Sequence, residues 1–216
     1  MTESQILQSL CEACRRLHDR NLLAAGDGNL SARLPDGRIA MTPAGVAKAW
    51  ITPRDFTFLQ LDGTILRGKP SSERLMHLAI YEACPEARVV VHAHPPTAIA
   101  WTLARPELKA LPSEALPEVI LGAGTIPIVP YARPGTAALA EGLRPFLPNH
   151  RLMVMARHGS VCWGEDAAEA AGGIERLEHV AQILKAAVEL GGPLPLDGEE
   201  LEALRRLRAE LGPRIR

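Results

Sequence analysis

Two histidines one residue apart close an apolar run in this chain, Arg88-Val-Val-Val-His92-Ala-His94. Side chains alternate along a β-strand, so His92 and His94 are predicted to share one face. Their Cα atoms would then lie about 7 Å apart, which lets two imidazoles bind one divalent ion. The prolines at 95 and 96 cannot continue a strand, so the pair marks a strand end. The pattern indicates part of a metal site, and two surface histidines at a strand end are the alternative.

A third histidine, His158, lies two residues after a second apolar segment, Leu152-Met-Val-Met-Ala156. Gly159 comes next, so a turn can present the imidazole at the end of that strand. Three imidazoles are the ligand set of an open catalytic zinc site, in which a free coordination position accepts a substrate oxygen. A lone histidine after a strand is usually a surface residue, so this interpretation depends on the other two.

An acidic residue follows two serines in Pro70-Ser71-Ser72-Glu73, at the start of a predicted helix. In a structural interpretation the serines cap the helix, and the negative charge of Glu73 is stabilised by the positive N-terminal end of the helix dipole. In a functional one, the hydroxyls and free amides bind an anion while Glu73 acts as a general base. His77 lies four residues on and can share the helix face of Glu73, and we expect it to be a buried structural residue.

Two loops have the composition of phosphate-binding nests, Gly26-Asp-Gly28-Asn29-Leu-Ser31 and Thr42-Pro-Ala-Gly45. Ordinary turns explain each loop equally well when it is taken alone. The first loop does not open a helix after a strand, so it is not a dinucleotide-binding fingerprint, and no P-loop lysine follows.

The composition of the 216-residue chain is that of one globular domain spanning residues 1–216, with 47% hydrophobic and 23% charged residues. The net charge of −1 gives no general attraction to nucleic acid or to anionic membranes. No signal-peptide pattern or run of 18 apolar residues occurs, so we expect a cytoplasmic protein. Cys11 and Cys14 fall on the apolar stripe of a predicted helix, which favours burial over zinc or redox chemistry.

Hydrophobic periodicity predicts helices over residues 3–24, 71–84, 97–104, 136–146, 166–190 and 198–211. Strands are expected over residues 29–33, 38–41, 56–60, 64–66, 88–94 and 152–156. Asp36-Gly37 and Asp62-Gly63 are typical of hairpin turns. The elements therefore predict an α/β protein with a mixed or antiparallel sheet packed between helices.

Five blocks, taken together and in order, resemble the class II aldolase and adducin family. They are GDGNLS at 26–31, TPAG at 42–45, PSSE at 70–73, VVHAH at 90–94 with RHG at 157–159, and PYARPGT at 130–136. The resemblance runs from about residue 5 to 195. It implies a three-layer α/β/α domain on a mixed, largely antiparallel sheet, and a homotetramer with sites between subunits.

The resemblance also implies roles for the matching residues. His92, His94 and His158 would bind Zn²⁺, or Mn²⁺, Co²⁺ or another divalent metal, and Glu73 would be the catalytic acid and base. The implied residues of the substrate phosphate site are Gly28, Asn29, Thr42, Gly45, Ser71 and Ser72. The expected partner is thus a small sugar phosphate, with no nucleic acid and no membrane.

The implied activity is metal-dependent cleavage of a ketose 1-phosphate to dihydroxyacetone phosphate and an aldehyde, reversibly. The substrate would resemble fuculose 1-phosphate, or be 5-deoxyribulose or 5-methylthioribulose 1-phosphate. Fuculose-phosphate aldolases use one tyrosine just before the Leu121-Gly-Ala-Gly124 region and another near the C-terminus. Residues 112–118 and 197–216 contain no tyrosine.

Tyr131 is therefore the candidate proton donor, with loop packing as its other possible role. Glu114 and Glu118 are further candidates. A pentulose-phosphate 4-epimerase or a methylthioribulose-1-phosphate dehydratase would use the same metal site. A metal-free adducin-like binding module is the alternative from another class, and the retained histidines and Glu73 argue against it.

Overall fold

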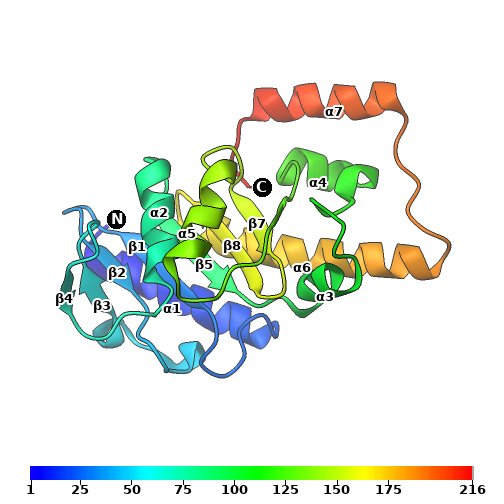
Figure 1. Ribbon diagram of the computed structural model, residues 1–216. Coiled ribbons are helices and arrows are strands. Elements are labelled where there is room, and N and C mark those ends of the chain that lie inside the picture. Colours follow the sequence, from blue (N-terminus) through cyan, green and yellow to red (C-terminus); the bar gives the residue numbers. More distant parts are fainter. Residues whose placement is uncertain (216) are drawn as a thin grey trace.

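A mixed eight-stranded sheet forms the centre of the protein in the computed structural model, which describes residues 1–215 (Figure 1). The strands are β1 Asn29–Arg33, β2 Ile39–Met41, β3 Thr57–Leu59, β4 Ile65–Arg67, β5 Val89–Ala93, β6 Ile128–Val129, β7 Leu152–Met155 and β8 Gly159–Gly164. Their order in the sheet is β4-β3-β2-β1-β5-β8-β7-β6. Only the β6–β7 pair is parallel, and the other pairs are antiparallel.

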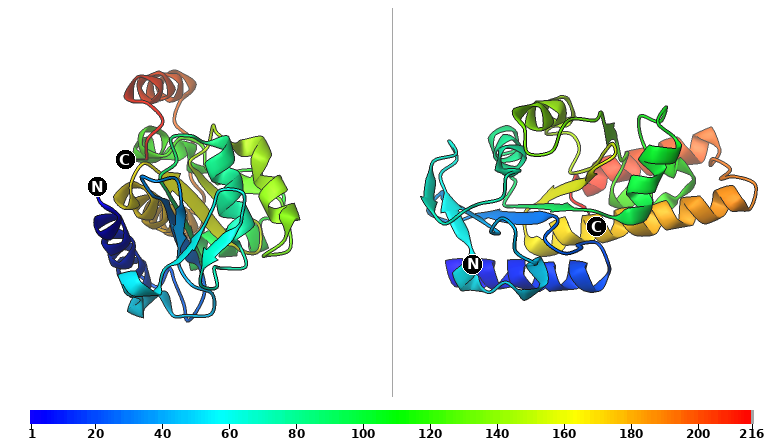
Figure 2. Two further views of the ribbon diagram at one scale, coloured as in Figure 1. Left: turned by 90° about the vertical axis from the view of Figure 1, so that its left-hand side faces the viewer. Right: turned by 60° about the horizontal axis from the view of Figure 1, so that its bottom comes forward.

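Helices cover both faces of this sheet, as the two views in Figure 2 show. They are α1 Glu3–Asp19, α2 Arg74–Ala83, α3 Pro96–Ala104, α4 Pro117–Gly122, α5 Ala137–Leu143, α6 Ala167–Glu189 and α7 Gly198–Leu211. Short 3₁₀ turns occur at Lys48–Trp50, Pro53–Asp55, Ser113–Ala115 and Arg144–Phe146. The α1, α3 and α6 helices pack on one face and α2 and α5 on the other. The predicted three-layer α/β/α fold is confirmed.

Strand β5 lies in the middle of the sheet and shows how the two cores are separated. Val89, Val91 and Ala93 belong to the core beneath α1 and α6. Val90 belongs to the core beneath α2 and α5, and His92 shares its face because side chains alternate. Side-chain alternation along β5 therefore places His92 on the face of the sheet that α2 covers.

Three local predictions differ from the structure. Helix α1 ends at Asp19 rather than residue 24, because Asn21 adopts a left-handed φ of 58° and the chain turns there. Strand β8 was not predicted, since Gly159–Gly164 is buried along its whole length and shows no polar alternation. Ser71 and Ser72 do not cap α2, which begins at Arg74 with Glu73 as its N-cap residue.

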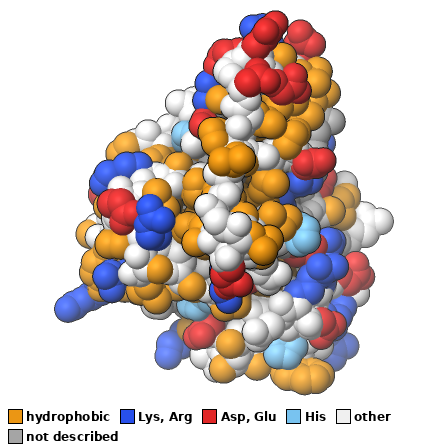
Figure 3. Space-filling model, turned by 90° about the vertical axis from the view of Figure 1, so that its right-hand side faces the viewer, with side chains coloured by type: hydrophobic (Ala, Val, Ile, Leu, Met, Phe, Trp, Pro, Cys, Tyr) orange, Lys and Arg blue, Asp and Glu red, His pale blue; other side chains and the backbone are white. Residues whose placement is uncertain are grey.

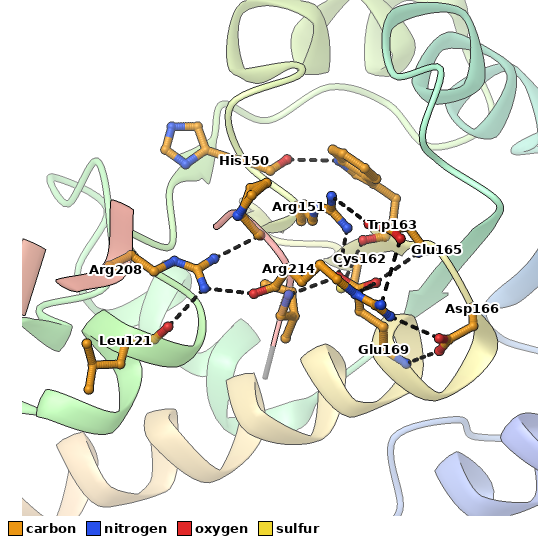
Figure 4. A network of polar contacts seen from close by, with 12 residues as sticks. Leu121, His150, Arg151, Cys162, Trp163, Glu165, Asp166, Glu169, Arg208 and Arg214 are labelled. Atoms are coloured by element: carbon orange, nitrogen blue, oxygen red, sulfur yellow. Dashed lines mark hydrogen bonds and ion pairs between the residues drawn. The ribbon is translucent and has the colours of Figure 1, made fainter. Parts of the chain in front are cut away.

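Helix α7 and the chain after it are attached to the rest of the protein by the polar network in Figure 4. Arg208 donates to the carbonyls of Leu121 and Arg214, at 2.9 and 2.7 Å. Arg214 forms ion pairs with Asp166 and with the buried Glu169, at 3.0 and 3.2 Å. The last described residues are thereby held at the start of α6.

The end of the molecule seen in Figure 3 carries many apolar side chains. Large exposed apolar side chains of α3, the end of α6 and the following linker are Leu103, Val188, Leu190 and Leu194. A groove of about 300 Å³ runs between α3 and the end of α6.

The homotetramer stays a prediction. Across residues 1–215, no helix is both long and apolar enough to cross a bilayer.

Candidate metal centre and active site

The three histidines predicted as metal ligands lie together at one end of the sheet. His92 and His94 come from the end of β5, and His158 from the β7–β8 turn. Strand β5 pairs antiparallel with β8, and Ala93 lies opposite Ser160, so the turn falls beside the end of β5. The ring of His92 lies 4.8 Å from each of the other two rings, centroid to centroid. One ligand nitrogen from each ring lies within 4.8 Å of the others.

Hydrogen bonding fixes which nitrogen of His92 is free. The carbonyl of Ser160 can only accept, so Nδ1–H of His92 donates to it at 2.8 Å. With Nδ1–H bonded to Ser160, Nε2 is the nitrogen available to a metal, and it lies 3.0 Å from His94 Nε2 and 3.1 Å from a Glu73 oxygen. An imidazole nitrogen and a carboxylate oxygen this close need a cation between them, a proton or a metal ion, so this donor set fits a divalent metal. It is also the tautomer that a metal-binding histidine requires.

Glu73 lies against two of the three imidazoles. Its Oε2 is 3.1 Å from His92 Nε2, and its Oε1 is 3.1 Å from His158 Nε2. Burial raises the pKa of this carboxyl, but the contacts with His158, His92 and the Asn29 amide outweigh burial and lower the pKa below its usual value. Burial and the neighbouring histidines lower the pKa of His94 to about 4, which keeps that ring neutral. The site thus combines the Glu73 carboxylate with a neutral His94 ring at pH 7.

Two glycines leave room for the imidazoles. A Cβ at Gly159 would lie 2.7 Å from the Ala93 carbonyl oxygen and 2.7 Å from Cδ2 of His94. Gly28 has a φ of +67°, and a Cβ there would lie 2.7 Å from the His92 carbonyl oxygen. The sequence analysis names Gly28 as a residue of the phosphate-site loop. Gly159 was not predicted as a functional residue, and its place in Arg157-His158-Gly159 was the available signal.

The loops around residues 26–31, 42–45 and 70–73 are joined by hydrogen bonds. The Thr42 hydroxyl accepts from the Leu30 amide at 3.1 Å, and the Ala44 amide donates to the Lys69 carbonyl at 3.0 Å. The ammonium of buried Lys48 donates to the carbonyls of Gly26 and Val46, both at 2.7 Å. Burial lowers the pKa of Lys48. Lys48 was missed, because a single lysine between loops carries no sequence signal.

The predicted phosphate-site residues occupy different depths in these loops. Ser72 and Gly45 are exposed, and Gly45 has a left-handed φ of 70°. Thr42 is fully buried, and the Ser71 hydroxyl accepts from the Glu73 amide at 3.2 Å. Asn29 is buried, with its side chain bonded to Glu73 and His77. The outer residues are accessible to a ligand, and the inner ones support the loops.

Tyr131 lies on the exposed loop after β6, with 61% of its surface accessible. The same loop reaches the predicted phosphate site, where Gly135 lies beside Ser72. Glu114 forms an ion pair with Arg205 of α7, at 2.6 Å. Both side chains of that pair are exposed, and the roles of Glu114 and Tyr131 remain predictions.

A mixed sheet with helices on both faces is also the fold of the solved structures that resemble this chain. The family model "Class II Aldolase and Adducin N-terminal domain" matches residues 8–184, and the chain belongs to this family.

Similar proteins include 3-oxo-tetronate 4-phosphate decarboxylase of Escherichia coli K12, 35% identical over 84% of this chain and 88% of that protein. L-fuculose phosphate aldolase of Methanococcus maripaludis is 34% identical over 82% of this chain and 94% of that protein. The crystal structure of Escherichia coli YgbL, titled as an aldolase, epimerase or decarboxylase, superposes with a TM-score of 0.88. It is 30% identical and covers 94% of this chain and 99% of that one.

Proposed function

We propose that this protein is a metal-dependent carbon–carbon lyase that acts on a short sugar phosphate. One observation carries the proposal: the Glu73 carboxylate lies 3.1 Å from nitrogens of two of three converging histidines. A proton donor and acceptor thus adjoins a set of metal ligands. A divalent metal bound there supplies a Lewis acid that polarises the substrate's carbonyl and neighbouring hydroxyl oxygens.

The reaction we favour is decarboxylation of 3-oxo-tetronate 4-phosphate, the substrate in the name of the Escherichia coli relative. The bond between C1 and C2 breaks, CO₂ leaves, and the electron pair forms the enediolate of dihydroxyacetone phosphate. Glu73 then takes a proton from solvent and delivers it to C2, which leaves the carboxylate ionised as before. The departing CO₂ carries no hydroxyl proton that must be removed. This chemistry therefore agrees with the missing tyrosines at 112–118 and 197–216.

Retro-aldol cleavage of a ketose 1-phosphate is the second candidate. It passes through the same enediolate, but the C4 hydroxyl must lose its proton as the aldehyde leaves. Tyr131 is our candidate for that proton transfer, because its loop lies beside Ser72 and an L-fuculose phosphate aldolase is 34% identical to this chain. Epimerase and dehydratase reactions on the same site are outcomes that the test below distinguishes.

The chain's own residues have separate roles in either cleavage. The loops at 26–31, 42–45 and 70–73 would hold the phosphate, and that remote binding orients the reacting carbons. His92 is kept in its metal-binding tautomer by Ser160. Asn29 holds one oxygen of Glu73. Glu73 moves the proton at carbon.

The test is a product assay on protein loaded with Zn²⁺ or Mn²⁺. Samples receive 3-oxo-tetronate 4-phosphate or one of a panel of ketose 1-phosphates, and dihydroxyacetone phosphate, CO₂ and aldehyde are measured separately. Dihydroxyacetone phosphate with CO₂ supports decarboxylation, and dihydroxyacetone phosphate with an aldehyde supports the aldolase. Turnover without dihydroxyacetone phosphate points to epimerase or dehydratase chemistry and overturns the lyase. Full turnover in chelator-treated protein overturns the metal role.

A further inference from the structure

A continuous chain of buried side chains runs from the interior of α2 to Glu73. The Tyr81 hydroxyl lies 2.9 Å from Ser31 Oγ, which lies 2.7 Å from His77 Nδ1. His77 Nε2 lies 2.5 Å from Asn29 Oδ1, and Asn29 Nδ2 lies 2.9 Å from Glu73 Oε2. The side chains come from β1 and α2 and from the residue before α2. At 9% accessibility, Glu73 is the most exposed of the five.

The chemistry of each group fixes the direction of every hydrogen bond in this chain. A carboxylate only accepts, so the amide of Asn29 must turn its NH₂ group toward Glu73. The Asn29 oxygen then faces His77, whose Nε2 must carry the hydrogen. Burial lowers the pKa of His77 to about 3, so the ring is neutral and Nδ1 has no hydrogen. Nδ1 therefore accepts from the Ser31 hydroxyl.

Tyr81 completes the chain because the Ser31 oxygen, having given its hydrogen to His77, accepts the Tyr81 hydroxyl. Every donor thus points toward Glu73. The reverse Asn29 orientation would place its oxygen against the Glu73 carboxylate and its NH₂ group against the His77 hydrogen. Two repulsive contacts in a buried site would result, each leaving a buried polar group without a partner.

We propose that His77, supported by Ser31 and Tyr81, is a positioning residue that locks the Asn29 amide and so holds Glu73 Oε2 in place. Oε1 of Glu73 faces His158 Nε2 at 3.1 Å and has no hydrogen-bond donor among residues 1–215 that holds it as Asn29 holds Oε2. With Oε2 bonded to Asn29, we assign to Oε1 the transfer of the proton to and from carbon. This inference rests on the proposed role of Glu73, and it goes beyond that role by assigning separate tasks to the two carboxylate oxygens.

The direction of the hydrogen bonds from Tyr81 to Glu73 is tested without any activity measurement. Two-bond ¹H–¹⁵N NMR spectra of the full chain distinguish the two neutral histidine tautomers. We expect His77 to be protonated at Nε2 at pH 7, and in Ser31→Ala to show partial protonation at Nδ1, while Ser31→Thr keeps the wild-type tautomer. Protonation of His77 at Nδ1 in the unmodified protein overturns this hydrogen-bond direction and the inference with it.

The functional consequence is tested by exchange of the carbon-bound hydrogen of dihydroxyacetone phosphate with D₂O, followed by NMR on metal-loaded protein. This half-reaction needs Glu73 but not the identity of the leaving group. We expect His77→Leu to lower the exchange rate constant roughly 10- to 100-fold, as the loss of outer-shell partners does elsewhere. KM for dihydroxyacetone phosphate should change less than kcat. His77→Gln, which keeps a donor toward Asn29, should recover most of the rate.

The outcomes separate this inference from the proposed function. No exchange in the unmodified protein contradicts the function of Glu73 itself. Normal exchange there, with equal losses in folded His77→Leu and His77→Gln of full metal content, means that His77 only packs, and overturns the inference. If His77→Leu does not fold, the pair Ser31→Ala and Ser31→Thr applies the same test. Equal exchange rates in that pair also overturn the inference.

Discussion

At the scale of single residues, the site depends on groups whose charge state is set by burial and by their immediate partners. Glu73 is ionised although it is buried, because histidines and the Asn29 amide face it. His92 is held as one tautomer by a backbone carbonyl. A carboxylate held in this way can take a proton from carbon and return it.

Replacing Glu73 by glutamine should remove this proton transfer while keeping the shape of the side chain. We expect kcat to fall by about 10² to 10⁴, the usual contribution of a general acid–base residue. Turnover measured with the active substrate, alongside metal content by atomic emission, checks the prediction. Asp62→Asn, which changes a carboxylate in the turn between β3 and β4, is the control. Near-normal kcat in Glu73→Gln would assign the proton transfer to another group.

His77 should make the stability of the protein depend on pH. Its folded-state pKa of about 3 lies below its ordinary value of 6.5, so below pH 6.5 the unfolded chain binds a proton that the folded protein excludes. Stability is retained above pH 6.5 and falls as the pH decreases toward 3. Between pH 6.5 and 5 this single group should cost about 2 kcal/mol.

Urea unfolding at both pH values, for the unmodified protein and for His77→Gln, isolates this contribution from other titrating groups. The drop in unfolding free energy should be smaller in the variant by about 2 kcal/mol. Parallel pH profiles for the two proteins would contradict the depressed pKa of His77.

At the scale of secondary structure elements, the ligands come together because β5 and β8 are neighbours in the sheet. The β7–β8 turn carries His158 to the end of β5, and Gly159 lets the strands approach closely. Glu73 arrives from the opposite direction, at the start of α2. The proposed active site thus lies where one end of the sheet meets the start of a helix.

The substitution Gly159→Ala should push the β7–β8 turn away from the end of β5. A methyl group would lie 2.7 Å from both the Ala93 carbonyl oxygen and the His94 ring, so strand or ring must move. We expect metal affinity to fall by about 10- to 100-fold, comparable to the loss of an outer-shell contact. Competition with a chromophoric chelator measures it. Gly172→Ala in α6, where a methyl group meets open space, should leave affinity unchanged.

At the scale of the whole molecule, the proposed metal ligands and Glu73 span residues 73 to 158, and their convergence depends on the complete sheet. Binding at such a site stabilises the folded state, because the unfolded chain does not keep the ligands together. Metal at 100 times its dissociation constant should add about 2.7 kcal/mol.

Thermal unfolding with and without a chelator measures this linkage. For a chain of this length we expect the midpoint to rise by about 5–10 °C on adding Zn²⁺. His158→Ala should show a much smaller rise, since it lacks one of the three ligands. An identical midpoint in chelator and in excess Zn²⁺ would contradict a metal site at these histidines.

The sequence alone determined the features that depend on local order along the chain. The apolar run before His92, the glycine-containing loops and the helical periodicities gave the α/β class, and β1 and α7 were predicted with their observed bounds. These signals are local because side-chain alternation and helical spacing reflect which face is buried. The ordered blocks also led to the family.

Only the tertiary structure decided the partners of each side chain. Strand β8 was missed because both its faces are buried, and with it the carbonyl of Ser160 that orients His92. His77 is buried as expected, and from α2 it bonds to both Ser31 and Asn29 of β1, which the sequence did not indicate. Hydrogen-bond partners distant in the chain leave no periodic pattern, so their pairing emerges only when the sheet and helices have packed.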